Sequence, residues 1–154
     1  MKKSLVMACV ALFTVNSHAH VKLEPASASA STYQKLTFRV GHGCAGSATH
    51  TLTIVLPEAI TGAKPMPKPG WSVSSANPRE ISWKGGPLLD AHFDEFALQV
   101  KLPAATGKHY FKVTQLCDQG RLDWVELPSA SDAARKSPAP MLEIVPAAAS
   151  AHHH

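Results

Sequence analysis

Histidine 20 is the residue of this sequence whose chemistry depends most on its position in the chain. It follows Ser17-His18-Ala19, and Ser17 and Ala19 are the small residues that a signal peptidase accepts before its cut. Cleavage after Ala19 would give His20 a free α-amine beside its imidazole. Together these nitrogens can chelate a metal, and they suit Cu(II), the tightest-binding divalent ion of the first transition row. The alternative is an incidental histidine in a frayed end, and the spacing alone favours neither.

The residues before this point have the pattern of an export signal. Lys2 and Lys3 form a positive start, and the apolar run 5–15 that follows is too short to cross a bilayer as a helix. The alternative, an anchoring N-terminal helix, is disfavoured because neither stop-transfer charges nor a second apolar run follows. We therefore expect residues 1–19 to be a signal peptide. The mature chain is expected in the periplasm or outside the cell, with no membrane span.

A second group of ligand-capable residues stands in the segment Ala91-His92-Phe93-Asp94-Glu95-Phe96. With the period of a strand, His92 and Asp94 would share one face, and Glu95 would point to the other. Each alone is more often a solvent-facing residue of a strand edge. A carboxylate is nevertheless what a Cu(II) site with two nitrogen donors still needs.

Three further residues are candidates for contact with a metal. Trp124 lies in Asp123-Trp124-Val125-Glu126, where a tryptophan is more often core than site. Its indole N–H only donates, but its ring face can cover a cation. His42 stands in a glycine-rich loop and Met66 in a proline-rich run. A thioether is a soft donor, so Met66 would matter chiefly for Cu(I).

Three cysteines are present, and Cys9 would leave with the signal peptide. The remaining pair, Cys44 and Cys117, most simply forms one disulfide in an oxidising compartment. The alternative is a thiolate copper site, but Cys117 has no histidine or methionine close behind it, as a blue-copper site would require.

Composition and motifs exclude several function classes. Without Lys2 and Lys3 the chain has 13 basic and 11 acidic residues, a net charge of +2, and no basic stripe, so nucleic acid is not an expected partner. Hydrolase, zinc-protease, phosphate-loop and dinucleotide motifs are absent from the sequence. The neighbouring carboxylates at 94 and 95 suit glycosidase chemistry poorly, because adjacent strand residues point to opposite faces.

Apolar residues alternate with polar ones along most of the chain, with turn residues between the runs. This pattern predicts a single immunoglobulin-like antiparallel β-sandwich of about seven or eight strands with one disulfide. The predicted strands are 35–40, 52–56, 71–75, 81–83, 96–102, 109–116, 122–127 and 141–145. The proline-rich run 64–70 is expected as an extended connection outside any internal ladder.

The predicted domain organisation is simple. We expect a signal peptide at 1–19, one domain at 20–146, and a His-rich tail or purification tag at 147–154. The length of the middle segment suffices for one hydrophobic core.

Taken together, these residues resemble the YcnI-like family of extracytoplasmic bacterial copper-binding domains. The resemblance covers about residues 20 to 145. It rests on His20-Val21, Gly41-His42-Gly43-Cys44, Lys64-Pro65-Met66-Pro67-Lys68-Pro69-Gly70-Trp71, Ala91-His92-Phe93-Asp94-Glu95-Phe96, Cys117-Asp118-Gln119-Gly120 and Trp124-Val125-Glu126-Leu127-Pro128.

The resemblance implies a β-sandwich with one copper ion in a mono-histidine brace. His20 would bind Cu(II) through amine and ring, a carboxylate would complete the coordination, and Trp124 would lie beside the metal. Glu95 matches that carboxylate first and Asp94 second. His42, His92 and Met66 are not shared by every member, which leaves the full ligand set open.

We expect a copper-binding protein, not an enzyme, that sequesters copper or exchanges it with periplasmic chaperones or a membrane copper transporter. One alternative is a copper-dependent oxidative enzyme, for which His42 or His92 would supply a second imidazole. The other is a metal-free interaction or adhesion sandwich.

Overall fold

The computed structural model describes residues 20–129 and 135–147. The predicted signal peptide and the tail beyond residue 147 lie outside the described residues. The described part contains strands and no helix, as the alternation predicts. In particular, it has no helix long and apolar enough for a membrane span.

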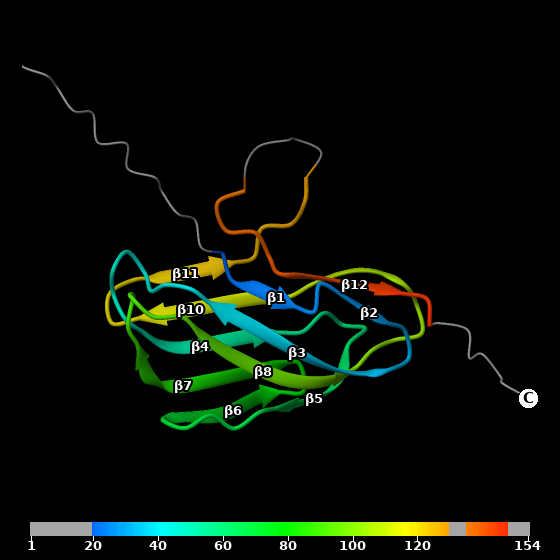
Figure 1. Ribbon diagram of the computed structural model, residues 1–154, viewed down its shortest axis with the longest axis horizontal. Coiled ribbons are helices and arrows are strands. Elements are labelled where there is room, and N and C mark those ends of the chain that lie inside the picture. The colour runs from blue at the N-terminus through cyan, green and yellow to red at the C-terminus, as the bar shows by residue number, and fades with distance from the viewer. Residues whose placement is uncertain (1–19, 130–134, 148–154) are drawn as a thin grey trace, which may run out of the picture.

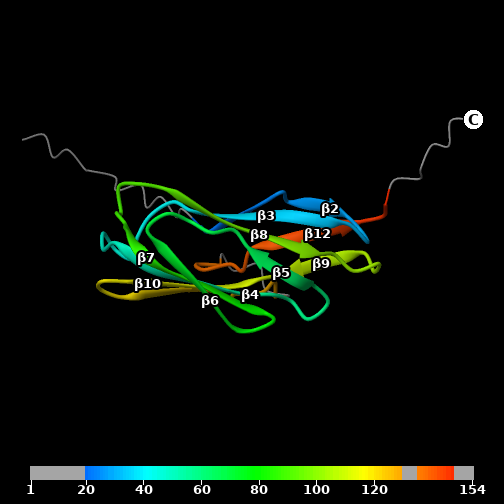
Figure 2. The ribbon, with the colours of Figure 1, turned by 90° about the horizontal axis from the view of Figure 1, so that it is seen from below.

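The strands form two large sheets and one small sheet. Their bounds are β1 Lys22–Glu24, β2 Ser27–Ser29, β3 Tyr33–Val40, β4 Thr49–Val55, β5 Thr61–Pro65, β6 Trp71–Asn77, β7 Glu80–Leu88, β8 Asp94–Lys101, β9 Gly107–Tyr110, β10 Lys112–Cys117, β11 Arg121–Trp124 and β12 Met141–Val145. The first sheet has the order β1-β3-β8-β5, the second β11-β10-β4-β7-β6, and the third β2-β12-β9. Figure 2 shows the layers edge-on, with β3 in one and β4 and β10 in the other.

Side-chain alternation turns one face of each large sheet into the core. In β3 every second residue is buried from Leu36 to Val40, and β4 and β10 alternate in the same way. Strand β3 lies between β1 and β8 in the first sheet. Its residue Arg39 is opposite Lys22 of β1 and Glu95 of β8. Residues between the buried positions, such as Arg39, therefore point to the outer face.

The large sheets bring two edge strands together. β1 ends the first sheet and β11 ends the second, so the sandwich opens between them. Figure 1 shows β1 beginning beside the end of β11. This open edge holds the candidate site.

The structure differs from the sequence prediction in several strands. Twelve strands are described instead of seven or eight, because the segment 20–31 and the region near 61–65 contribute three short strands that were not predicted, and the predicted strand 109–116 is divided into β9 and β10. Strand β2 pairs with β12 in parallel, so the third sheet is mixed. His92 and Phe93 precede β8 instead of lying within it. The first two residues of the proline-rich run, Lys64 and Pro65, end the edge strand β5 and pair with β8, and Met66 donates a backbone hydrogen bond to Ala97. The run thus borders the sheet at its edge and joins no internal ladder.

The predicted disulfide is confirmed. Cys44 and Cys117 are bonded, with their Cα atoms 5.9 Å apart and 73 positions apart in sequence. The bond ties the loop after β3 to the end of β10.

Candidate metal centre

His20 and Trp124 lie together at the open edge of the sandwich. Their ring centroids are 5.8 Å apart and the rings meet edge to face, at 85°. Val21, the next residue, is buried, so the chain enters the fold directly behind His20. The Nε2 atom of His20 is buried as well. The structure therefore brings His20 and Trp124 together.

Trp124 is held between the sheets by its place in β11. It pairs with Val113 of β10, which is fully buried, and side chains directly opposite each other in a ladder share a face. The indole is accordingly only 4% exposed. Its N–H donates a hydrogen bond to Oε1 of Gln115, at 3.3 Å.

Gln115 is a buried polar residue that sequence analysis did not single out. Its side chain is fully buried, and its amide nitrogen donates to the carbonyl oxygen of His42 and to Oγ1 of Thr49, both at 2.7 Å. An indole N–H only donates and a carbonyl only accepts, so these partners fix the orientation of the amide. Gln115 thereby links Trp124 to the backbone of His42.

The loop after β3 brings His42 to the same indole. The centroids of the His42 and Trp124 rings are 6.2 Å apart, at 69°. The loop is closed by a tight turn in which Ala45 and Gly46 have φ values of 50° and 87°, and Cys44 and Ser47 exchange backbone hydrogen bonds.

Gly43 is required for this closure. A Cβ atom at Gly43 would lie 1.8 Å from the carbonyl oxygen of Ser47, so no larger residue fits. The amide of Gly43 donates to Oδ1 of Asp90 at 2.9 Å. This bond anchors the loop to the turn between β7 and β8, and Asp90 is a second residue that sequence analysis did not identify.

Glu95, the carboxylate that the resemblance favours as a ligand, is engaged elsewhere. Its Oε1 accepts hydrogen bonds from Arg39 at 2.8 and 3.1 Å, and its side chain is 45% exposed. The hydrogen bonds that Arg39 donates to Glu95, together with the nearby charge of Glu24, raise the pKa of Arg39. Glu95 shares the outer face of the first sheet with Arg39, whereas Trp124 points between the sheets. The structure thus does not bring Glu95 together with Trp124.

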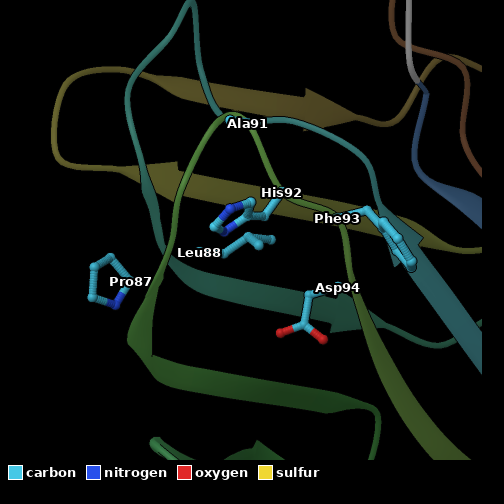
Figure 3. A pocket seen from close by; sticks show the side chains of 6 residues that line it. All are labelled: Pro87, Leu88, Ala91, His92, Phe93 and Asp94. Atoms are coloured by element: carbon cyan, nitrogen blue, oxygen red, sulfur yellow. The ribbon is translucent and has the colours of Figure 1, made fainter.

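Asp94 and His92 lie at a different surface. Together with Pro87, Leu88, Ala91 and Phe93 they line an open pocket of about 650 Å³. Figure 3 shows the His92 ring beside Leu88, with the Asp94 carboxylate directed away from that ring. Asp94 is bound by Lys68, which forms an ion pair with Oδ1. This pocket is formed without His20, His42 or Trp124.

Met66, the last of the candidates, is separated from the edge formed by β1 and β11. Met66 is 51% exposed and follows β5, three strands from β1, which is about 14 Å at normal strand spacing. His50 uses both ring nitrogens, with the hydroxyl of Thr51 and the carbonyl of Cys117. Met66 is therefore not positioned to bind a metal ion together with His20, and both ring nitrogens of His50 already have hydrogen-bond partners.

Whether the residues present fit copper depends on the α-amine of His20. Across residues 20–129 and 135–147, no three side chains of His, Cys, Asp or Glu lie close enough to hold a metal ion. A chelate of an α-amine and its own imidazole needs only one such side chain. In the full chain that nitrogen belongs to the peptide bond with Ala19, and cleavage would release it. His20 therefore fits the nitrogen donor set of Cu(II) once residues 1–19 are removed.

The fold and this edge define the protein as an immunoglobulin-like β-sandwich with a histidine–tryptophan cluster between its edge strands. It is similar to an uncharacterised protein from Nocardia farcinica whose crystal structure reveals an immunoglobulin-like fold. Sequence identity is 27% and the TM-score is 0.71, over 81% of this chain and 97% of that one.

Two more distant structures share the fold. The seventh ScaB type I cohesin from Pseudobacteroides cellulosolvens is 12% identical with a TM-score of 0.53, over 88% of this chain and 97% of that one. The Reelin-N domain of F-spondin is 12% identical with a TM-score of 0.52, over 82% and 85%. No curated protein matches the chain.

The chain belongs to the family described as domain of unknown function DUF1775, which it matches over residues 20–78 and 74–144. This is the YcnI-like family to which the sequence motifs pointed. The match begins at His20 and includes Trp124.

Proposed function

We propose that the chain, after cleavage behind Ala19, binds one Cu(II) ion through the α-amine and imidazole of His20, beside Trp124. The observation that carries this proposal is the edge-to-face contact of the two rings at 5.8 Å. A buried indole next to a chelating terminus would limit the access of water and of competing ligands to the metal. Its N–H is occupied by Gln115, so Trp124 would cover the ion without coordinating it.

The role that fits such a site is copper sequestration or delivery in the periplasm or outside the cell, without catalysis. A chelate at the edge of a sandwich lets a second protein approach the ion directly. The acceptors would be other copper chaperones or a membrane copper transporter. Cu(II) is the preferred form because the donors are amine and imidazole nitrogens, and Cu(I) would need softer ligands.

The copper-dependent oxidative enzyme remains a second candidate, and one observation favours it. His42 lies at the same indole as His20, so a second imidazole is close to the terminus. An enzyme would oxidise a polysaccharide when supplied with ascorbate and peroxide. A copper-loaded protein that leaves the polysaccharide unchanged is the result we expect.

The test is a Cu(II) titration of protein that begins at His20, with His152, His153 and His154 replaced by alanine in every sample. The tail must be changed because its histidines would bind copper themselves. We expect one ion per chain with sub-micromolar affinity and quenching of tryptophan fluorescence.

Two matched samples show whether the terminus is the ligand. One carries an extra methionine before His20, which converts the α-amine into an amide, and the other carries His20→Ala. Both should bind copper much more weakly. Equal binding by all three proteins would refute the proposal.

A further inference from the structure

His42 is the second histidine in contact with the indole that faces His20. Its ring lies 6.2 Å from that of Trp124, and its carbonyl oxygen is held by Gln115. The loop that carries it is fixed on two more sides, by the disulfide of Cys44 and by the bond from Gly43 to Asp90. His42 therefore belongs to a constrained loop and not to a free one.

The pairing of β1 with β3 runs toward both His20 and His42. Lys22 pairs with Arg39, so extending the antiparallel register by two residues sets His20 opposite Gly41. Opposed Cα atoms lie within about 5.5 Å and consecutive ones 3.8 Å apart, which puts the Cα atoms of His20 and His42 within about 9 Å. Two histidine side chains can span that separation with a metal between them.

The hydrogen bond made by the His42 ring leaves one of its nitrogens available to bind a metal ion. Its Nδ1 is hydrogen-bonded to the carbonyl oxygen of Gly43, and a carbonyl only accepts. Nδ1 must therefore carry the proton, which leaves a lone pair on Nε2 of the neutral ring. Metal-bound histidines are typically held in this way, with the second ring nitrogen donating to a carbonyl or carboxylate.

The other candidate ligands are either held in ion pairs or lie in a separate pocket. Glu95 is bound to Arg39 on the outer face of the sheet, and Asp94 is bound to Lys68. His92 lines a separate pocket. A carboxylate ligand would first have to leave its ion pair, whereas His42 already lies beside Trp124.

We infer that Nε2 of His42 is a third nitrogen ligand of the copper ion, so that the site of this chain has two histidines instead of one. The inference rests on the proposed function, because it presupposes copper at the amine and ring of His20. It adds a ligand that a mono-histidine brace does not have.

The test compares His42→Phe and His42→Asn with His92→Ala in the tail-substituted protein that begins at His20. Phenylalanine keeps an aromatic ring against Trp124, and asparagine keeps an amide that can donate to Gly43. His92→Ala removes a histidine outside the cluster. Unfolding temperature without copper identifies the variants that keep the fold.

We expect both His42 variants to bind Cu(II) at least about tenfold more weakly, because even the loss of an outer partner of a metal ligand has that effect. Electron paramagnetic resonance should show three coupled nitrogens in the parent and in His92→Ala, and two in the His42 variants. Unchanged affinity and three nitrogens in either folded His42 variant would overturn the inference.

The outcome is separable from that of the proposed function. If His42 is no ligand but His20 is, the His42 variants bind normally while His20→Ala does not. If the parent protein itself binds no copper, the proposed function fails and this inference fails with it.

Discussion

Replacing Gln115 by leucine should destabilise the protein, because three polar groups lose the hydrogen-bond partner that the amide provides. The substitution removes three hydrogen bonds and leaves the indole N–H of Trp124 buried without an acceptor. A buried unsatisfied donor costs about 1–3 kcal/mol. The carbonyl of His42 is only partly buried, and the hydroxyl of Thr49 still has the sulfur of Cys117 at 3.6 Å, so these two add about 0.5 kcal/mol each. We expect a total loss of about 2–4 kcal/mol.

The measurement is urea unfolding of Gln115→Leu beside Gln99→Leu. Gln99 lies on the exposed side of β8, where the same substitution should change the free energy of unfolding by no more than about 0.5 kcal/mol. Equal effects at the two positions would refute the argument that the buried amide holds the open edge together. Copper affinity should fall only in Gln115→Leu, because only that variant loosens Trp124 and His42.

A second substitution at the same position tests the role of the amide directly. Gln115→Glu keeps an oxygen for the Trp124 indole but turns the other oxygen toward the His42 carbonyl. Burial raises the pKa of the introduced carboxyl group in the folded protein. A group whose pKa is raised in the folded protein contributes its full stabilisation at pH values below its pKa in the unfolded chain. That contribution is lost as the pH rises through its pKa in the folded protein. The deficit relative to wild type should therefore grow between pH 4 and pH 7, and an equal deficit at both values would contradict the orientation assigned to Gln115.

Two further predictions concern the covalent and ionic contacts near the site. The double variant Cys44→Ala and Cys117→Ala should lose on the order of 4 kcal/mol in urea unfolding, because the bond closes a loop of 73 positions; a loss below about 1 kcal/mol would contradict this. Asp123→Asn should cost less than about 1 kcal/mol at pH 7, since its ion pair with Arg121 is exposed. The hydrogen bond from Arg121 lowers the pKa of Asp123 in the folded protein, so its contribution exists above the usual carboxyl pKa near 4 and disappears as the pH falls through the lower folded value. A difference from Asp123→Asn that persists well below that range would show that the charge of Asp123 is not its cause.

Much of the fold could be predicted from local alternation. The runs that became β3, β4 and β10 show a period of two over several residues, and β8 does so except at Ala97. The disulfide was predicted from the even number of cysteines left after export to an oxidising compartment. The three-residue strands β1 and β2 could not be found in this way, because an alternation of two or three residues is indistinguishable from a loop. β1 pairs with the nearby strand β3, whereas the partner of β2 is β12, which lies far along the chain.

The candidate site was predictable only in part, for the same reason. His20 and Trp124 were identified from a cleavage pattern and a family motif, and the structure places their rings in contact. The partner of Glu95 is Arg39, 56 positions away, and no sequence pattern near either residue predicts this ion pair. Gln115 lies within the predicted strand 109–116 and carries no motif of its own. The available signal was that a polar side chain occupied an inward position, after the buried Val113.

The position of these polar residues explains how a sandwich can keep one edge open. Closing the edge between β1 and β11 with apolar side chains would stabilise the core but would leave no donors near the terminus. Instead, Gln115 and Thr49 satisfy each other and the indole in the interior, so burial of polar groups there carries little penalty. The Cys44–Cys117 bond lies directly beside them and restrains the loop of His42. The loop that carries His42 is thus held at this edge by a covalent bond and by buried hydrogen bonds.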